Sequence, residues 1–380
     1  MADLHNLVRW HRTNALMSQA DLARRVGVTR QAISLIEAEQ TAPSTVVALR
    51  LAAVFRVPVE ALFYETGAGT LVSLSDPEDS VRAGERVVLA RVGGHLASHR
   101  AIGLSGHRLH ALPATGVAVA QPDAETAAET AASSDGLAAL RGGAETVMVE
   151  PAPGAALRTY GVIAGCDIGL GLLAAHVSDS SAAAQSVWRN ADNRRSLHLL
   201  RRGLVHAAAV HAVDGMDAQP LCAGDVRLGF ASWQSGWILR RAEGRSFGGA
   251  GDLASGRLRL VNRPIGSGAR SLLDRLLDEA SVDAHGIPGY DHVVDGHLQV
   301  ADAVASGVAD VGVGMAGAAF LAGLDFYPVC DEACDLIIPG GLLQDETVLR
   351  VIDTLHSDGF RWDLERFGPY DVSRTGRTIT

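Results

Sequence analysis

The sequence contains no lysine, so all 33 of its basic side chains are arginines. Any clamp for a phosphate or a carboxylate must therefore be built from planar guanidinium groups. Long hydrophobic runs are absent too, since no stretch of about 18 consecutive apolar residues is available to span a membrane. The N-terminal residues are polar and do not resemble a secretory signal. These absences argue against a membrane-bound or exported chain and lead us to expect a cytoplasmic protein.

Cysteine is scarce, and the four that occur are expected to be reduced thiols: Cys166, Cys222, Cys330 and Cys334. Cys330 and Cys334 are spaced like half a metal site, but no second ligand pair accompanies them. His206 and His211 lie in or beside an apolar run and are predicted to be core histidines. No nucleophile elbow, Walker loop or carboxylate pair stands out. We therefore predict no metal, no cofactor and no catalytic activity.

The chain is long enough, at 380 residues, for two or three domains. Its net charge of −10 argues at first against nucleic acid as a partner. Residues 1–63, however, carry seven arginines and five acids, a net charge of +2, so the acidic excess lies downstream. Whole-chain charge is a poor guide for a modular protein.

The pattern along the chain changes twice, which predicts domains at 1–65, 66–157 and 158–380. Residues 4–63 read as five short helices, the last beginning near Pro58. Residues 66–157 are rich in small residues, and we interpret them as a linker with a small β element, a hairpin at 86–100. From Arg158, strands alternate with helices, which indicates an α/β domain with a mainly parallel sheet.

The segment SQADLARRVGVTRQAISLIEAEQTAPS at 18–44 contains a helix, a turn with Gly27 and a second helix after Thr29. This is the geometry of a helix-turn-helix. The segment closely resembles the Xre/Cro-type DNA-binding family. By position, the resemblance implies that the second helix enters the major groove and that five residues contact DNA: Gln19, at a phosphate, and Thr29, Arg30, Gln31 and Ser34, at base edges. We interpret Glu37 as an ion-pair partner within the module.

A single module with a net charge of +2 binds DNA weakly. Family members gain affinity by dimerising on two half-sites about one helical turn apart. We therefore expect a homodimer on a double-stranded DNA operator.

The α/β domain carries three turns at helix starts: GCDIGLG at 165–171, NADNRRS at 190–196 and NRPIGSGAR at 262–270. Backbone N–H groups at helix starts suit anions. Together with HLQVADAVASGVADVGVG and LDFYPVCDEACDLIIP, these segments resemble the periplasmic-binding-protein-like domains of bacterial regulators and of some molybdopterin-biosynthesis proteins. The resemblance implies two α/β lobes of the type II, molybdate-binder-like class. The ligand contacts that it implies are Cys166, Asp167, Arg194, Ser196, Ser267, Gly268 and Arg270, with His297 from the opposite lobe.

Two residues argue against a simple oxyanion. Ala269 stands where the pattern often has a threonine hydroxyl, and the Asp167 carboxylate would repel an anion. A larger ligand with donor and acceptor groups fits as well as molybdate or tungstate. The sequence thus predicts a multidomain protein: an all-α helix-turn-helix bundle joined to a two-lobed α/β domain, acting as a regulator that responds to a small molecule or an oxyanion. The alternative is an enzyme or accessory protein of molybdenum-cofactor metabolism with an autoregulatory DNA-binding head.

Overall fold

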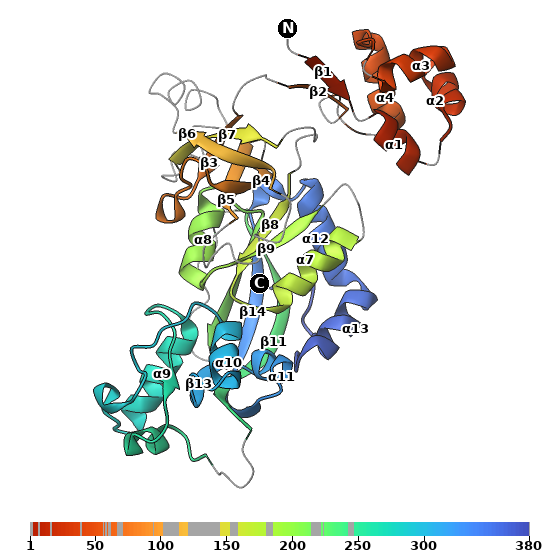
Figure 1. Ribbon diagram of the computed structural model, residues 1–380. Helices are drawn as coiled ribbons and strands as arrows, with labels where there is room; N and C mark the ends of the chain where they lie inside the picture. Colours follow the sequence, from red (N-terminus) through yellow and green to blue (C-terminus); the bar gives the residue numbers. More distant parts are fainter. Residues whose placement is uncertain are drawn as a thin grey trace.

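The computed structural model describes residues 3–379, except 7, 16, 39, 56, 58, 60–61, 67–70, 94, 102–113, 121–144, 153–158, 180–184, 214–221, 223 and 242–246. Its parts follow one another along the molecule (Figure 1): a helical bundle, a β-barrel, and an α/β domain whose sheet continues to the far end. No helix in the described part combines the length and the apolar character needed to cross a membrane.

The N-terminal bundle forms because each helix has a start signal and an apolar face. The Ser18 side chain caps the second helix in a capping box with Asp21, and Gly27 ends that helix in the left-handed conformation at φ 77°. Four helices and a strand pair make up the bundle: α1 (Val8–Asn14), α2 (Gln19–Val26), α3 (Arg30–Glu37), α4 (Thr45–Phe55), β1 (Asp3–Asn6) and β2 (Phe63–Thr66). The predicted fifth helix lies largely outside the described residues, and where it was expected to continue, Phe63 begins β2.

The segment interpreted as a linker forms a closed five-stranded barrel, with the strand order β3-β5-β4-β6-β7. Its strands are β3 (Leu71–Ser75), β4 (Arg86–Val92), β5 (His95–Arg100), β6 (Gly116–Ala120) and β7 (Glu145–Pro151). The predicted hairpin is the β4–β5 pair. The linker interpretation was wrong because the other strands are short and widely spaced in the sequence, and a closed barrel satisfies their edges through non-local pairing.

The α/β domain is built on a seven-stranded sheet with the order β12-β13-β11-β14-β10-β8-β9. The strands are β8 (Gly161–Gly165), β9 (Ser186–Asn190), β10 (Ala207–Val213), β11 (Val226–Leu239), β12 (Leu260–Val261), β13 (Val311–Met315) and β14 (Asp325–Ile338). The expected mainly parallel sheet is corrected to a mixed one. β14 pairs antiparallel with both β10 and β11, and β11 pairs antiparallel with β13.

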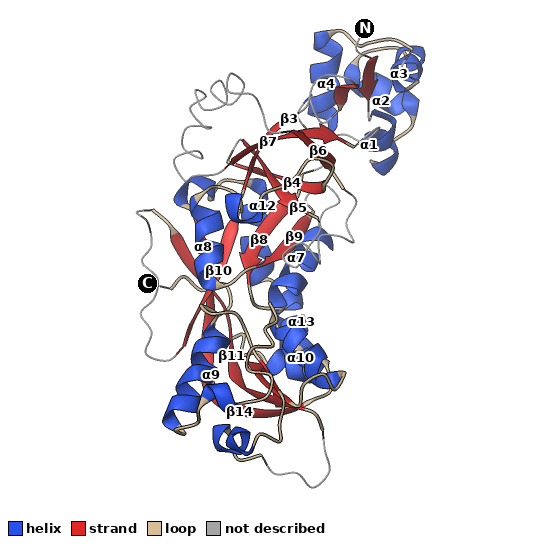
Figure 2. Cartoon of the chain, turned by 60° about the vertical axis from the view of Figure 1, so that its left-hand side comes forward, coloured by secondary structure: helices blue, strands red, loops and turns tan. Residues whose placement is uncertain are grey.

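Helices divide the domain into two lobes, joined by the long strands β11 and β14 (Figure 2). The first lobe carries α7 (Gly169–Asp179), α8 (Asn193–Arg201), α12 (Glu346–His356) and α13 (Asp358–Phe367); the second carries α9 (Gly268–Glu279), α10 (His297–Ala305) and α11 (Ala316–Leu321). The main apolar core includes Phe230 and Phe360, and a separate core lies under α9. The main core extends from the barrel through the first lobe to α10 and α11, so the two lobes share it, whereas the core under α9 belongs to the second lobe alone.

Candidate functional site

The start of α3 presents polar side chains to solvent. Ile33 and Ile36 are buried in the bundle, so the opposite face of the helix is open. Thr29 caps α3 by accepting a hydrogen bond from the Ala32 N–H. All four side chains predicted to contact base edges are exposed: Thr29, Arg30, Gln31 and Ser34. The fold thus brings these four onto one accessible surface.

Glu37 is held inside the bundle by an arginine and an amide. Arg12 donates to Glu37 from Nε at 2.6 Å and from Nη2 at 3.1 Å, and Gln19 donates from Nε2 at 2.9 Å. Burial opposes ionisation of Glu37, but these hydrogen bonds outweigh it and lower the pKa of the carboxyl. Glu37 is therefore the intramodule ion-pair partner that the sequence predicted. The contact also fixes the orientation of the Gln19 side chain.

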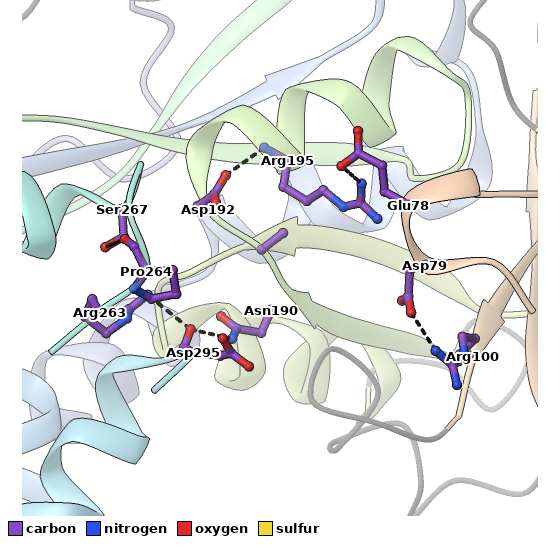
Figure 3. A pocket seen from close by; sticks show the side chains of 11 residues that line it. Glu78, Asp79, Arg100, Asn190, Asp192, Arg195, Arg263, Pro264, Ser267 and Asp295 are labelled. Atoms are coloured by element: carbon purple, nitrogen blue, oxygen red, sulfur yellow. Dashed lines mark hydrogen bonds and ion pairs between the residues drawn. The ribbon is translucent and has the colours of Figure 1, made fainter. Parts of the chain in front are cut away.

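A cavity of about 400 Å³ lies where the barrel meets both lobes (Figure 3). Its wall combines acids, arginines and polar groups. The lining residues are Glu78, Asp79, Arg100, Asn190, Ala191, Asp192, Arg195, Arg263, Pro264, Ser267 and Asp295. Turns that follow β9 and β12 supply five of them, and the barrel supplies the first three. The space suits a small ligand that carries both acceptor and donor groups.

Arg263 is a cavity residue whose hydrogen bonding is incomplete among the described residues. Arg263 is only 4 % exposed, and its Nη2 donates to the Asp295 carbonyl at 3.1 Å. Its Nε and Nη1 have no hydrogen-bond acceptor among the described residues. Burial lowers the pKa of the guanidinium, although Cys166 and Asp295 partly oppose the shift. A buried guanidinium with two unpaired nitrogens is well suited to an anion, because a bound anion would supply the missing acceptors.

The turn before α9 is partly in the cavity. Ser267 lines it and caps the helix, accepting from the Arg270 N–H at 3.2 Å and donating to the Pro264 carbonyl at 2.9 Å. Arg270 points elsewhere: its guanidinium binds Asp274 and lies 4.6 Å from the centre of the Tyr290 ring. Arg270 is thus a surface contact of α9, because its (i, i+4) acid and this aromatic ring hold it there.

The predicted contacts from α8 also fall outside the cavity. Arg194 is exposed, and Ser196 is buried and donates to the Ala191 carbonyl within its own turn. The neighbouring Arg195 lines the cavity instead. The helical period explains this difference, since adjacent residues point about 100° apart and the cap at Asp192 sets which one faces the cavity.

His297 belongs to the same lobe as Ser267, which corrects the expectation that it enters from the opposite one. It begins α10, and its Nδ1 accepts from the Met315 N–H at 3.3 Å. Burial, with the charges of Arg263 and His211, keeps the pKa of this imidazole well below its usual value. α10 leads into β13, which pairs with β12 in the second lobe. This strand pairing decides the lobe to which His297 belongs, and the sequence alone does not show it.

Cys166 and Asp167 lie at the seam between the lobes. Asp167 accepts from the Gly169 N–H and the Tyr370 hydroxyl, and burial raises its pKa to about 7. Cys166 Sγ lies 2.9 Å from His211 Nε2, and His211 Nδ1 lies 2.8 Å from Glu332 Oε2. Gly268 faces this group from the second lobe, since a Cβ there would lie 3.0 Å from His211 Cε1. His211 is therefore no ordinary core histidine.

His206, by contrast, is a satisfied core histidine, as the sequence predicted. Its Nδ1 accepts from the Val162 N–H, and its Nε2 contacts the Arg91 carbonyl at 2.9 Å. Sequence reasoning missed Arg263, Arg195, His211 and the barrel acids of the cavity wall. Two of them had a signal in the sequence: Arg263 lies in the same turn as Ser267, and Arg195 lies in the NADNRRS turn at 190–196.

Arginines tie the barrel to the first lobe. The short turn η2 (Pro77–Asp79) provides most of the acids. Arg189 is 4 % exposed at its side chain and binds Asp79 at 2.8 Å. Arg195 pairs with Asp76 and Glu78. The cavity wall and the barrel interface thus share the same charged side chains.

Comparison with known families identifies both ends of the chain. A helix-turn-helix family model matches residues 8–62, and a PBP superfamily domain model matches residues 174–356. The chain belongs to the helix-turn-helix family through its N-terminal domain, and it carries a PBP superfamily domain at its C-terminal end. Joined in one chain, these domains support a ligand-responsive transcriptional regulator.

Individual relatives and solved structures are similar to parts of the chain. An HTH-type transcriptional regulator of Methanothermobacter thermautotrophicus is 41% identical over 61 residues, 16% of this chain and 88% of that protein. The uncharacterized protein YvgK of Bacillus subtilis is 27% identical over 232 residues, 57% of this chain and 73% of YvgK. A putative phosphate ABC transporter substrate-binding protein from Clostridium perfringens, solved with bound phosphate, has 12% identity and a TM-score of 0.43, covering 55% of this chain and 98% of that one.

Proposed function

We propose that the protein is a one-component transcriptional regulator of the cytoplasm, in which an anionic ligand bound at the inter-lobe cavity changes the affinity of the N-terminal bundle for an operator. The observation that carries this proposal is Arg263, a buried guanidinium with two unpaired nitrogens in the cavity wall. The cavity's role is binding rather than catalysis.

The ligand that fits best is an organic anion that also carries N–H donors. Arg263 and Arg195 suit its anionic group, whereas Glu78, Asp192 and other wall acids favour a ligand with donors. A molybdate or tungstate ion has no N–H donors, so it could not form hydrogen bonds with these carboxylates and would be repelled by them. A molybdopterin-related compound has both kinds of group, and we place it ahead of the simple oxyanions.

On the DNA side, we propose that Thr29, Arg30, Gln31 and Ser34 contact base edges. Gln19 would add a phosphate contact. Its Nε2 has two N–H groups, and because one donates to Glu37, the other can donate to a phosphate oxygen. Two bundles on one operator would supply the affinity that a single module lacks, so we propose a homodimer. Ligand binding regulates such a dimer only if the two conformations bind the ligand with different affinity.

A thermal-shift panel on the full chain tests the ligand site. The probes are molybdate, tungstate, sulfate, phosphate and phosphorylated pterins. An anion at about 100 times its dissociation constant adds about 2.7 kcal/mol and raises the melting temperature. We expect Arg263→Gln to abolish this shift and Arg275→Gln, an exposed arginine on α9, to retain it.

The same ligand should then change binding to a duplex selected by the protein from a random pool, measured by fluorescence anisotropy. An unchanged DNA affinity at saturating ligand would contradict regulation. A full thermal shift in the Arg263→Gln variant would contradict the assignment of the site.

A further inference from the structure

Three neighbouring strands bring a thiol, an imidazole and a carboxylate into line. Cys166 follows β8, His211 lies in β10, and Glu332 lies in β14, and these strands are adjacent in the sheet. The imidazole Nε2 lies 2.9 Å from the sulfur, and Nδ1 lies 2.8 Å from the carboxylate, an ion-pair contact without the geometry of a hydrogen bond. Such an order, nucleophile to base to orienting acid, is the arrangement that activates a thiol.

The surroundings favour a charged imidazole. Burial disfavours the charge, but Cys166 and Glu332 outweigh it, so the pKa of His211 lies well above its usual value. Burial likewise opposes ionisation of Glu332, yet the contact with His211 lowers the pKa of that carboxyl. The side chains of His211 and Glu332 are only 7% and 3% exposed, so solvent screens their ion pair little.

Four other titratable groups lie around the cluster. Arg263 comes from the second lobe, and His297 is kept neutral there by burial and by Arg263. Asp167 follows Cys166 directly. Cys334 pairs with His211 in the sheet, and burial raises the pKa of its thiol well above the usual value. Only Cys166, of these two thiols, is in hydrogen-bond contact with the imidazole.

Access to the sulfur is narrow. Cys166 is 6 % exposed and does not line the 400 Å³ cavity. Such burial disfavours a bulky electrophile, and hydrogen peroxide has only two heavy atoms. Two buried donors near the cluster lack acceptors among the described residues: Trp233 Nε1, whose ring lies 5.9 Å from that of His211, and the free N–H groups of Arg263. They would accommodate a small polar molecule.

We propose that Cys166 is a site of oxidation by hydrogen peroxide. The thiolate attacks one peroxide oxygen, an S–O bond forms, and the O–O bond breaks. Sulfur is oxidised to a sulfenic acid and the peroxide is reduced, and the departing hydroxide takes the imidazolium proton of His211 to leave as water. The sulfenic acid is neutral, so the ion pair between the Cys166 thiolate and the His211 imidazolium is lost. Glu332 acts as a positioning residue through His211.

The experiment follows peroxide oxidation of the full chain by mass spectrometry of quenched, alkylated peptides. Cys222 is the internal control because it is exposed. An ordinary thiol is less than about 1% ionised at pH 6, so we expect Cys166 to gain oxygen at least about tenfold faster than Cys222 at that pH. Catalase added before the peroxide should prevent the gain.

Variants distinguish activation of the Cys166 thiol by His211 and Glu332 from a purely structural role of these two residues. We expect Cys166→Ser to abolish the fast oxidation and Cys222→Ser to leave it unchanged. His211→Asn and Glu332→Gln should make the rate at Cys166 fall steeply as the pH drops from 8 to 6, whereas the wild-type rate stays nearly flat. Thermal melts identify variants that do not fold, and the pH profile of the wild type needs no variant. Preferential oxidation of Cys222, or a wild-type profile as steep as that of Cys222, would overturn the proposal.

Discussion

At the scale of single residues, Arg263 and Glu37 are two buried charges in different conditions. Glu37 accepts three hydrogen bonds from Arg12 and Gln19, so its charge is compensated inside the bundle. Arg263 keeps two nitrogens, Nε and Nη1, without an acceptor among the described residues. Burying an uncompensated charge costs several kcal/mol, and proteins retain such groups mainly where a ligand completes them. Compensation therefore distinguishes a structural charge from a binding one.

Arg30 offers the sharpest residue-scale prediction on the DNA side. Arg30→Ala removes a guanidinium that can bind a guanine edge at two points, so we expect a loss of about 1–3 kcal/mol in specific binding. Affinity for a random duplex should change much less. Competition titrations with the selected operator and a scrambled duplex measure both, and Arg275→Ala serves as the control. An equal loss on both duplexes would mean that Arg30 contacts phosphate only.

At the scale of elements, α9 meets the first lobe through a glycine. Gly268→Ala would place a Cβ 3.0 Å from His211 Cε1, and His211 cannot retreat because Cys166 and Glu332 hold it. We expect the variant to separate the lobes and to weaken binding of whichever anion stabilises the wild type. Calorimetric titration measures the affinity.

Gly359→Ala is the matched control, since it lies in the first turn of α13 with nothing within 4 Å of the new Cβ. It should leave the affinity unchanged and stabilise the fold by up to about 1 kcal/mol. Equal anion affinity in the two variants would show that the lobes do not close on His211.

Elements were predictable where local signals fix them. Ser18, Gly27 and Thr29 mark the helix-turn-helix in the sequence, and Ser267 marks the start of α9. The barrel was missed because strands such as β3 and β7 pair across seventy or more residues. Of the cavity, Ser267 was foreseen. The barrel acids were not, because their place in the wall depends on tertiary docking that no local pattern encodes.

At the scale of the whole molecule, the cavity stands where three parts meet, so the barrel takes part in forming the site. Asp79 lines the cavity and also binds Arg189, which is almost fully buried. A ligand that draws on Arg195 competes with Asp76 and Glu78 of the barrel for the same guanidinium. Ligand binding would thus be felt first at the barrel, the part nearest to the helical bundle along the chain.

Asp79→Ala tests this coupling. Without Asp79, buried Arg189 keeps its longer ion pair with Asp76, at 3.5 Å, so we expect up to about 3 kcal/mol of destabilisation. Amide exchange should accelerate in β5 and in residues 190–195. Glu279→Ala, which breaks a half-exposed pair with Arg275, should cost no more than about 0.5 kcal/mol. Unchanged exchange in β5 would show that the barrel is docked by other contacts.

The long strands β11 and β14 have a mechanical consequence. Fourteen residues of strand extend about 45 Å, and these two stay hydrogen-bonded through both lobes. If one lobe rotates relative to the other, the β11–β14 pair must twist further along its length. The register shifts at Gly229/Ala231 and Ser235/Gly236 are where the ladder yields most easily. We therefore expect ligand binding to be transmitted as a change of angle between stiff bodies, without the folding of a disordered segment.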